Sequence, residues 1–141
     1  MQDFLTFVSQ NLLLFAALAV TLVMLFLNLF GSRLKGYQPV DPAEAVNLIN
    51  HDNALVLDVR EVNEYQSGHI LNARHIPQSA LAKRLDELEK ERNRPIILVC
   101  RSGSRSGHVA GMLKKHGFEK VYNLSGGIMA WQNANLPLTR K

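Results

Sequence analysis

The segment PIILVCRSGSRS, residues 95–106, decides the fold of this chain. Its first part is a short continuous apolar run, which is typical of a strand buried on both faces of a parallel sheet. Small and basic residues follow Cys100, and apolar residues then recur at helical spacing at Val109, Met112 and Leu113. In open α/β sheets, ligand sites lie beyond the carboxyl ends of the strands. The segment therefore predicts a strand, a site loop that starts after Cys100, and a helix.

Strands and helices alternate on both sides of this segment. Residues 54–59 are a further short apolar run, residues 121–124 predict another strand, and residues 73–76 predict a shorter strand. Residues 41–44, Asp-Pro-Ala-Glu, form a helix start with an N-cap aspartate, a proline at the first position and an acid at the third. A chain of 141 residues has room for one ordinary domain, and its 47% hydrophobic content excludes a disordered chain. The alternation predicts one parallel α/β sheet.

The loop after Cys100 has the features of an anion site with a nucleophile at its base. A loop rich in Gly and Ser can turn successive backbone N–H groups inward, and the N-terminus of the next helix adds partial positive charge. Arg101 and Arg105 supply full charges. A thiol in this setting ionises below its free pKa of about 8.5, which gives a nucleophile at neutral pH. The alternative is a buried structural cysteine, which is common in protein cores.

Several motifs, in the same order along the chain, resemble the rhodanese-like sulfurtransferase family over roughly residues 40–137. They are LDVRE at 57–61, EY at 64–65, GHI at 68–70, Ala73, HIP at 75–77, the Cys100 loop, LSGG at 124–127 and Ala130-Trp131. The resemblance implies the family's α/β fold, a five-stranded, mostly parallel sheet with helices on both faces. We expect this domain to occupy residues 39–141.

The resemblance also implies an activity, the transfer of sulfane sulfur. Cys100 matches the family's cysteine, which attacks an anionic donor such as thiosulfate, carries the sulfur as a persulfide and passes it to a thiol or protein acceptor. The residues that would bind the donor and the persulfide are Arg101, Ser102, Gly103, Ser104, Arg105 and Ser106. Asp58 and Arg60 match a motif that borders the site in this family, and we expect them to support the loop rather than react.

Other polar and aromatic residues in the family motifs are expected to be structural. No metal-ligand spacing pairs His69 with His75, so we expect neither a metal nor another cofactor. Tyr65 and Trp131 are interpreted as core or rim residues. The single cysteine excludes an internal disulfide, a cysteine-rich zinc site and a two-cysteine redox centre.

Residues 12–30 predict a transmembrane helix. Of these 19 residues, 17 are Ala, Val, Leu, Met or Phe, and no charge occurs between Asp3 and Arg33. The run spans about 28 Å, close to the bilayer's apolar thickness of about 30 Å. A signal peptide would have a basic start and a small-residue cleavage site, and a core helix would be shorter and amphipathic. We expect a short tail at 1–11, a retained span at 12–30 and a linker at 31–38.

The charge distribution predicts the orientation of this span. All 16 Lys and Arg residues follow residue 30, and Arg33 and Lys35 flank the span directly. The positive-inside rule then predicts a single-pass protein of the plasma (inner) membrane, with the N-terminus outside and the C-terminal domain in the cytoplasm. The lipid bilayer is one expected partner, and the anchor also suits a membrane-protein partner. Basic residues are scattered among acids with no nucleic-acid motif, so we expect no nucleic acid partner.

Two other functions fit parts of this pattern. A cysteine phosphatase shares the strand, cysteine loop and helix, but it needs an arginine six positions after the cysteine, where this chain has Ser106. A membrane-tethered interaction module could use the same fold as a docking surface, because one fold can serve many functions. The presence of Cys100 and both loop arginines favours catalysis, since a scaffold needs none of them.

Overall fold

The computed structural model describes residues 1–34 and 36–141. Lys35, one of the two basic residues expected to flank the span, lies outside the described residues. The chain divides into two compact units, Met1–Leu34 and Lys35–Lys141.

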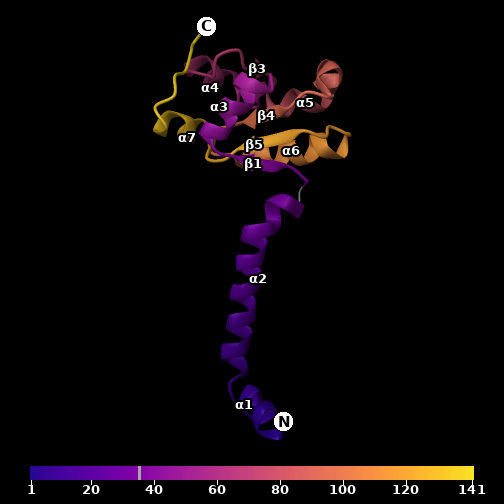
Figure 1. The fold of residues 1–141 in the computed structure, drawn as a ribbon, viewed down its shortest axis with the longest axis vertical. Helices are drawn as coiled ribbons and strands as arrows, with labels where there is room; N and C mark the ends of the chain where they lie inside the picture. Colours follow the sequence, from indigo (N-terminus) through magenta and orange to yellow (C-terminus); the bar gives the residue numbers. More distant parts are fainter. Residues whose placement is uncertain (35) are drawn as a thin grey trace. The chain divides into compact units, whose positions relative to one another are not determined.

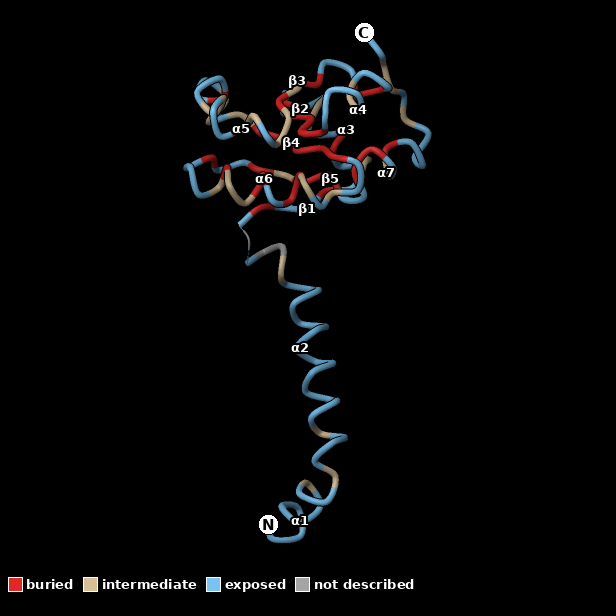
Figure 2. Tube along the Cα trace, turned by 180° about the vertical axis from the view of Figure 1, so that it is seen from behind, coloured by how far each residue is buried: buried red, intermediate tan, exposed pale blue. Residues whose placement is uncertain are grey.

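The first unit contains a helix with the length and composition of a membrane span. It is α2 (Leu12–Leu34), the longest helix of the chain (Figure 1). The stretch Leu12–Gly31 has a mean hydropathy of 2.6 and none of it is buried, as the pale blue of Figure 2 also shows. Its polar Thr21 donates a hydrogen bond to the carbonyl of Ala17 at 2.8 Å, so the hydroxyl is satisfied within the helix.

The ends of this unit differ from the expected boundaries. The expected tail contains a second helix, α1 (Gln2–Gln10), in which Phe4, Leu5, Phe7 and Val8 share one face. Asn11 separates the two helices. At the other end, α2 continues to Leu34, so residues 31–34 of the expected linker are helical. A glycine such as Gly31 costs a helix only about 1 kcal/mol relative to alanine, which is too little to end it.

The second unit is built on a five-stranded sheet in the order β1-β5-β4-β2-β3, and every neighbouring pair is parallel. The strands are β1 (Gln38–Val40), β2 (Leu55–Asp58), β3 (Arg74–His75), β4 (Ile96–Val99) and β5 (Val121–Leu124). The last four confirm the strands expected from the apolar runs. The first, β1, has no such run and begins inside the expected linker.

Helices cover both faces of the sheet, as expected (Figure 1). They are α3 (Pro42–His51), α4 (Val62–Ser67), α5 (Gln78–Arg84), the 3₁₀ helix η1 (Leu85–Glu91), α6 (Ser104–Lys115) and α7 (Gly127–Asn133). The start of α3 has the expected N-cap, because the Asp41 carboxylate accepts from the Glu44 N–H at 2.8 Å.

Alternate residues of the central strands enter two separate cores. Leu57 and Leu98 pack on the side of α5, η1 and α6, whereas Val56 and Ile97 pack on the side of α3, α4 and α7. Because both faces are covered, β2 and β4 are buried along their whole length, which appears as red tube in Figure 2. The continuous apolar runs in the sequence arise from this double burial.

Candidate active site

Cys100 is the residue directly after β4, the middle strand of the sheet. Its side chain is 1% exposed and belongs to the core beside α6. The strands on either side, β2 and β5, end at the same edge of the sheet because all strands are parallel. The thiol therefore lies at the base of the 101–106 loop.

Gly103 brings the backbone of the loop against the sulfur. Its N–H donates to the Cys100 Sγ at 3.0 Å. Its φ of +97° is in the left-handed region, and a Cβ there would lie 3.3 Å from the carbonyl oxygen of Leu124. Gly103 also precedes α6, so the partial positive charge of that helix start faces the thiol. The residue type is thus required by the same geometry that makes the anion cradle.

Ser106 and Asn123 place a second hydrogen-bonding group beside the sulfur. The buried Ser106 hydroxyl lies 3.2 Å from the Cys100 Sγ and 2.5 Å from Oδ1 of Asn123. Asn123, on β5, also donates from Nδ2 to the carbonyl of Gly103 at 3.0 Å. The hydroxyl has one proton, so it can accept from the thiol while donating to Asn123, or it can donate to the thiolate.

These contacts favour the ionised form of Cys100. Burial opposes ionisation, but hydrogen bonds from the Ser106 hydroxyl and from the N–H groups of Ser106, Gly103 and Ser102 outweigh it, and they lower the pKa of Cys100 below its ordinary value. A larger fraction of thiolate is then present at neutral pH, as expected for a nucleophile.

Ser106→Ala should raise the pKa of Cys100, because it removes a buried donor to the thiolate. The midpoint of the pH profile for alkylation by iodoacetamide should move upward by about one pH unit, the equivalent of about 1.4 kcal/mol. Ser104→Ala, at an exposed serine of the same helix, is the control and should leave the profile in place. An unchanged midpoint in Ser106→Ala would show that the hydroxyl does not act on the thiolate.

Arg105 forms a partly exposed ion pair with Glu64. Its guanidinium donates from Nη1 and Nη2 to the two carboxylate oxygens of Glu64 on α4, at 2.8 and 2.7 Å. This forked geometry is among the stronger ion pairs that side chains form. Arg101, in contrast, is exposed and makes no side-chain hydrogen bond to any residue in the described parts of the chain. Of the two arginines expected to attract the donor, Arg101 is the more exposed, and the side chain of Arg105 is 35% exposed but bonded to Glu64.

Both members of this pair stay ionised. The hydrogen bond from Arg105 lowers the pKa of Glu64 to about 2, against an opposing effect of burial, with a further contribution from the Glu61 N–H. The pKa of Arg105 is raised, first by its hydrogen bond with Glu64 and then by the negative charges of Glu64, Cys100 and Glu61. Arg105 therefore lies within electrostatic range of the Cys100 thiolate, although both of its Nη groups are hydrogen-bonded to Glu64.

Asp58 and Arg60 form a buried ion pair beside the site. Asp58 ends β2 and is 1% exposed, and the Arg60 guanidinium bonds its carboxylate at 2.7 Å and the carbonyl of Gly68 at 2.7 Å. Among the described residues, none of these bonds reaches the Cys100 loop. The pair joins β2 to the end of α4, the helix that carries Glu64, so its support of the loop is indirect.

The start of α7 closes the other side of the loop. The Ile128 N–H donates to the carbonyl of Cys100 at 2.9 Å, and the Met129 N–H donates to that of Arg101 at 3.2 Å. Gly127 allows this approach, because a Cβ there would lie 2.3 Å from the Cys100 carbonyl oxygen. The glycine pair before Ile128 is therefore part of the site's construction.

The other predicted side chains make no hydrogen bond to the sulfur among the described residues. Ser102 is exposed on the loop and faces Cys100 only through its backbone N–H, and Ser104 is exposed at the start of α6. Tyr65 stacks between His69 and His75, with ring centroids at 3.7 and 4.3 Å. Trp131 is buried and donates to the carbonyl of Pro137. The aromatic residues thus pack against one another or the backbone.

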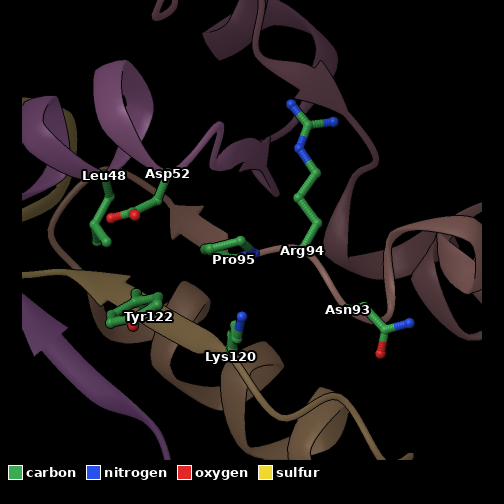
Figure 3. A pocket seen from close by; sticks show the side chains of 7 residues that line it. All are labelled: Leu48, Asp52, Asn93, Arg94, Pro95, Lys120 and Tyr122. Atoms are coloured by element: carbon green, nitrogen blue, oxygen red, sulfur yellow. The ribbon is translucent and has the colours of Figure 1, made fainter.

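A cavity of about 350 Å³ lies elsewhere in this unit (Figure 3). Pro95 and Lys120, which line it, precede β4 and β5, whereas Cys100 follows β4. The cavity is therefore at the opposite end of the strands from the thiol, and the Cys100 loop is the better candidate for chemistry.

Two residues of the site were not predicted from the sequence. Asn123 could have been noticed as a polar residue at a buried position of a strand, VYNL. Glu64 carries a local signal only as a capping residue three positions after Glu61. Its pairing with Arg105, 41 residues away, has no local signature.

The model of the rhodanese-like domain family matches residues 41–134. YibN of Escherichia coli (strain K12), described as uncharacterized, is 33% identical over 141 residues, which are 99% of each chain. Thiosulfate sulfurtransferase GlpE of Pseudoalteromonas translucida is 34% identical over 98 residues, which are 70% of this chain and 91% of GlpE.

Solved structures have the same fold. The crystal structure of a rhodanese-related protein from Thermoplasma volcanium aligns with a TM-score of 0.68 at 30% identity. The alignment covers 74% of this chain and 100% of that one.

Proposed function

The chain belongs to the rhodanese-like domain family, and on this basis we propose that it is a membrane-anchored sulfurtransferase that carries sulfane sulfur as a persulfide on Cys100. The observation that carries the proposal is the pair of donors at the Cys100 Sγ, the Gly103 N–H at 3.0 Å and the Ser106 hydroxyl at 3.2 Å. A structural cysteine needs no such donors. The test is transfer of sulfur from thiosulfate to cyanide by the purified protein.

The first half of the reaction loads the sulfur. The Cys100 thiolate attacks the outer sulfur of thiosulfate, a new S–S bond forms, the S–S bond of thiosulfate breaks, and sulfite leaves with the bonding electron pair. The product is Cys100–S–S⁻, so no external oxidant or reductant is needed. Because the loop lowers the pKa of Cys100, a larger fraction of the thiolate is available to attack the donor without a general base.

The second half-reaction transfers the sulfur from Cys100 to an acceptor. An acceptor thiolate attacks the outer sulfur of the persulfide, and the Cys100 thiolate leaves, stabilised again by the Gly103 N–H and the Ser106 hydroxyl. With cyanide as acceptor the product is thiocyanate. Fixed donors that face a developing negative charge can contribute about 3 kcal/mol each to catalysis. The loop amides therefore serve both half-reactions.

The span is proposed to be a retained single-pass anchor in the inner membrane, with the catalytic domain in the cytoplasm. The support is the length and hydropathy of Leu12–Gly31 and the position of all Lys and Arg residues after it. A cytoplasmic location also suits a free thiol, since the cytoplasm is reducing.

A fluorescent protein fused after Lys141 should be active in cells, and alkaline phosphatase fused at the same position should be inactive, because the phosphatase folds only after export. Cell fractionation should recover both fusions with the membrane. The matched control places the phosphatase before Met1, where it should be active. Phosphatase activity from the C-terminal fusion would reverse the orientation.

A further inference from the structure

We propose that Glu64 determines the donor class of this site: by accepting hydrogen bonds from both Nη groups of Arg105, it disfavours dianionic donors such as thiosulfate relative to persulfides, R–S–SH or R–S–S⁻, that bring at most one negative charge when R is neutral. This inference rests on the proposed sulfur transfer at Cys100 and names the substrate class that suits it.

The charges around the thiol show why an anion is weakly attracted. Arg105 interacts with three negative groups, Glu64, Glu61 and the Cys100 thiolate. Both carboxylate oxygens of Glu64 are within 2.8 Å of its guanidinium nitrogens. Glu64 remains ionised at any working pH, since its pKa is about 2. Of the two loop arginines, only Arg101 has no carboxylate partner among the described residues. Its side chain is exposed, so solvent and salt weaken its attraction for an anionic donor.

The chemistry of the two donors differs in charge but not in the bonds that change. With R–S–SH, the Cys100 thiolate attacks the outer sulfur, the S–S bond of the donor breaks, and R–S⁻ leaves while Cys100–S–SH forms. When R is neutral the total charge is −1 for the protonated donor and −2 for R–S–S⁻, since persulfides are stronger acids than thiols. Thiosulfate instead brings two negative charges to a thiolate, and the total is −3. Repulsion by Glu64 therefore acts more strongly on thiosulfate than on the persulfide.

Glu64→Gln isolates the charge from the fold. Glutamine also fills the third position of a capping box, so the bond from the Glu61 N–H, now 3.0 Å, can be kept. Glu44→Gln is the matched control, because Glu44 has the same capping role in α3, with the Asp41 N–H at 3.0 Å, and has no arginine partner among the described residues. Both changes are made in the full-length protein in detergent.

The first readout does not depend on sulfur transfer. Iodoacetate and iodoacetamide have the same size and alkylate the same thiolate, so the ratio of their rates reports the potential at Cys100. Glu64→Gln should raise the iodoacetate-to-iodoacetamide ratio about five- to tenfold at low salt, and Glu44→Gln should leave it unchanged. An unchanged ratio in Glu64→Gln overturns the proposal, even if the protein proves to transfer no sulfur.

The second readout compares donors. In Glu64→Gln the KM for thiosulfate should fall about five- to tenfold, while kcat/KM for mercaptoethanol persulfide should change by a smaller factor, about threefold at most. Equal changes for both donors would assign Glu64 a purely structural role. If neither donor supports turnover, the proposed function fails while the alkylation ratio still decides the role of Glu64.

A third measurement needs no variant. In the wild type, added KCl should leave the iodoacetate-to-iodoacetamide ratio nearly constant or raise it, because the site has little net positive charge to screen. A severalfold fall of the ratio with salt would mean that free arginines attract the anion, and it would overturn the proposal.

Discussion

Cys100→Ser should abolish sulfur transfer from thiosulfate to cyanide, with a loss of at least about a thousandfold, because a hydroxyl at neutral pH cannot replace the thiolate as nucleophile or as sulfur carrier. The fold should remain, since serine is close in size to cysteine and the neighbouring Ser106 hydroxyl can accept its proton. Intact mass after thiosulfate treatment should show one added sulfur in the wild type, lost on exposure to cyanide, and none in Cys100→Ser.

Ser102→Ala is the matched control for this change, because Ser102 is an exposed serine of the same loop. In the described structure the Ser102 side chain makes no hydrogen bond to the Cys100 sulfur. The rate of sulfur transfer should therefore stay close to that of the wild type. The chain has a single cysteine, so the loaded sulfur cannot be released by an internal disulfide and should persist until an acceptor is added. If the wild type were inactive with every sulfane donor, that result would favour a membrane-tethered interaction module over a sulfurtransferase.

Arg60→Ala should reduce the free energy of unfolding by about 3–5 kcal/mol, which is typical when one partner of a buried ion pair is removed. The change leaves the Asp58 carboxylate, 1% exposed, without its guanidinium, and it leaves the carbonyl of Gly68 without its donor. Urea unfolding of the full-length protein, followed by the fluorescence of the single and buried Trp131, measures this loss directly.

Arg74→Ala provides the comparison for a surface pair. Arg74 bonds Glu91 at 3.1 Å with its own side chain 37% exposed, so its removal should cost no more than about 1 kcal/mol. A loss in Arg60→Ala as small as that in Arg74→Ala would mean that Asp58 is solvated or neutralised when its partner is absent. In that case the pair would not anchor α4 as the geometry indicates.

Much of the fold could be predicted from the sequence because the central strands are buried on both faces. The sequences of β4 and of β2 up to Asp58 are continuously apolar for this reason, and Cys100 with its small-residue loop marks the edge where a site forms. These signals are local, so one sequence is enough to read them.

The parts that were missed depend on distant contacts. The strand β1 (Gln38–Val40) has only three residues and lies at the edge of the sheet, and it is a strand only because it pairs with β5. Arg105 could be predicted as a cation at the site. Its ion pair with Glu64 could not, because it depends on where the fold places α4, the helix after β2. Asn123 likewise acquires its role from Ser106 and Gly103, which lie on the preceding loop and helix.

The pairing of β1 with β5 has a consequence for the newly made chain. Gln38 lies opposite Tyr122, so about eighty residues must be synthesised before the first strand finds its partner, which takes about 4–17 s at about 5–20 residues per second. Cys100 leaves the ribosome before Asn123 and Gly127, the residues that close its loop. During that interval the thiol lacks the contacts that these residues provide, and its environment is complete only when β5 and α7 have joined the sheet.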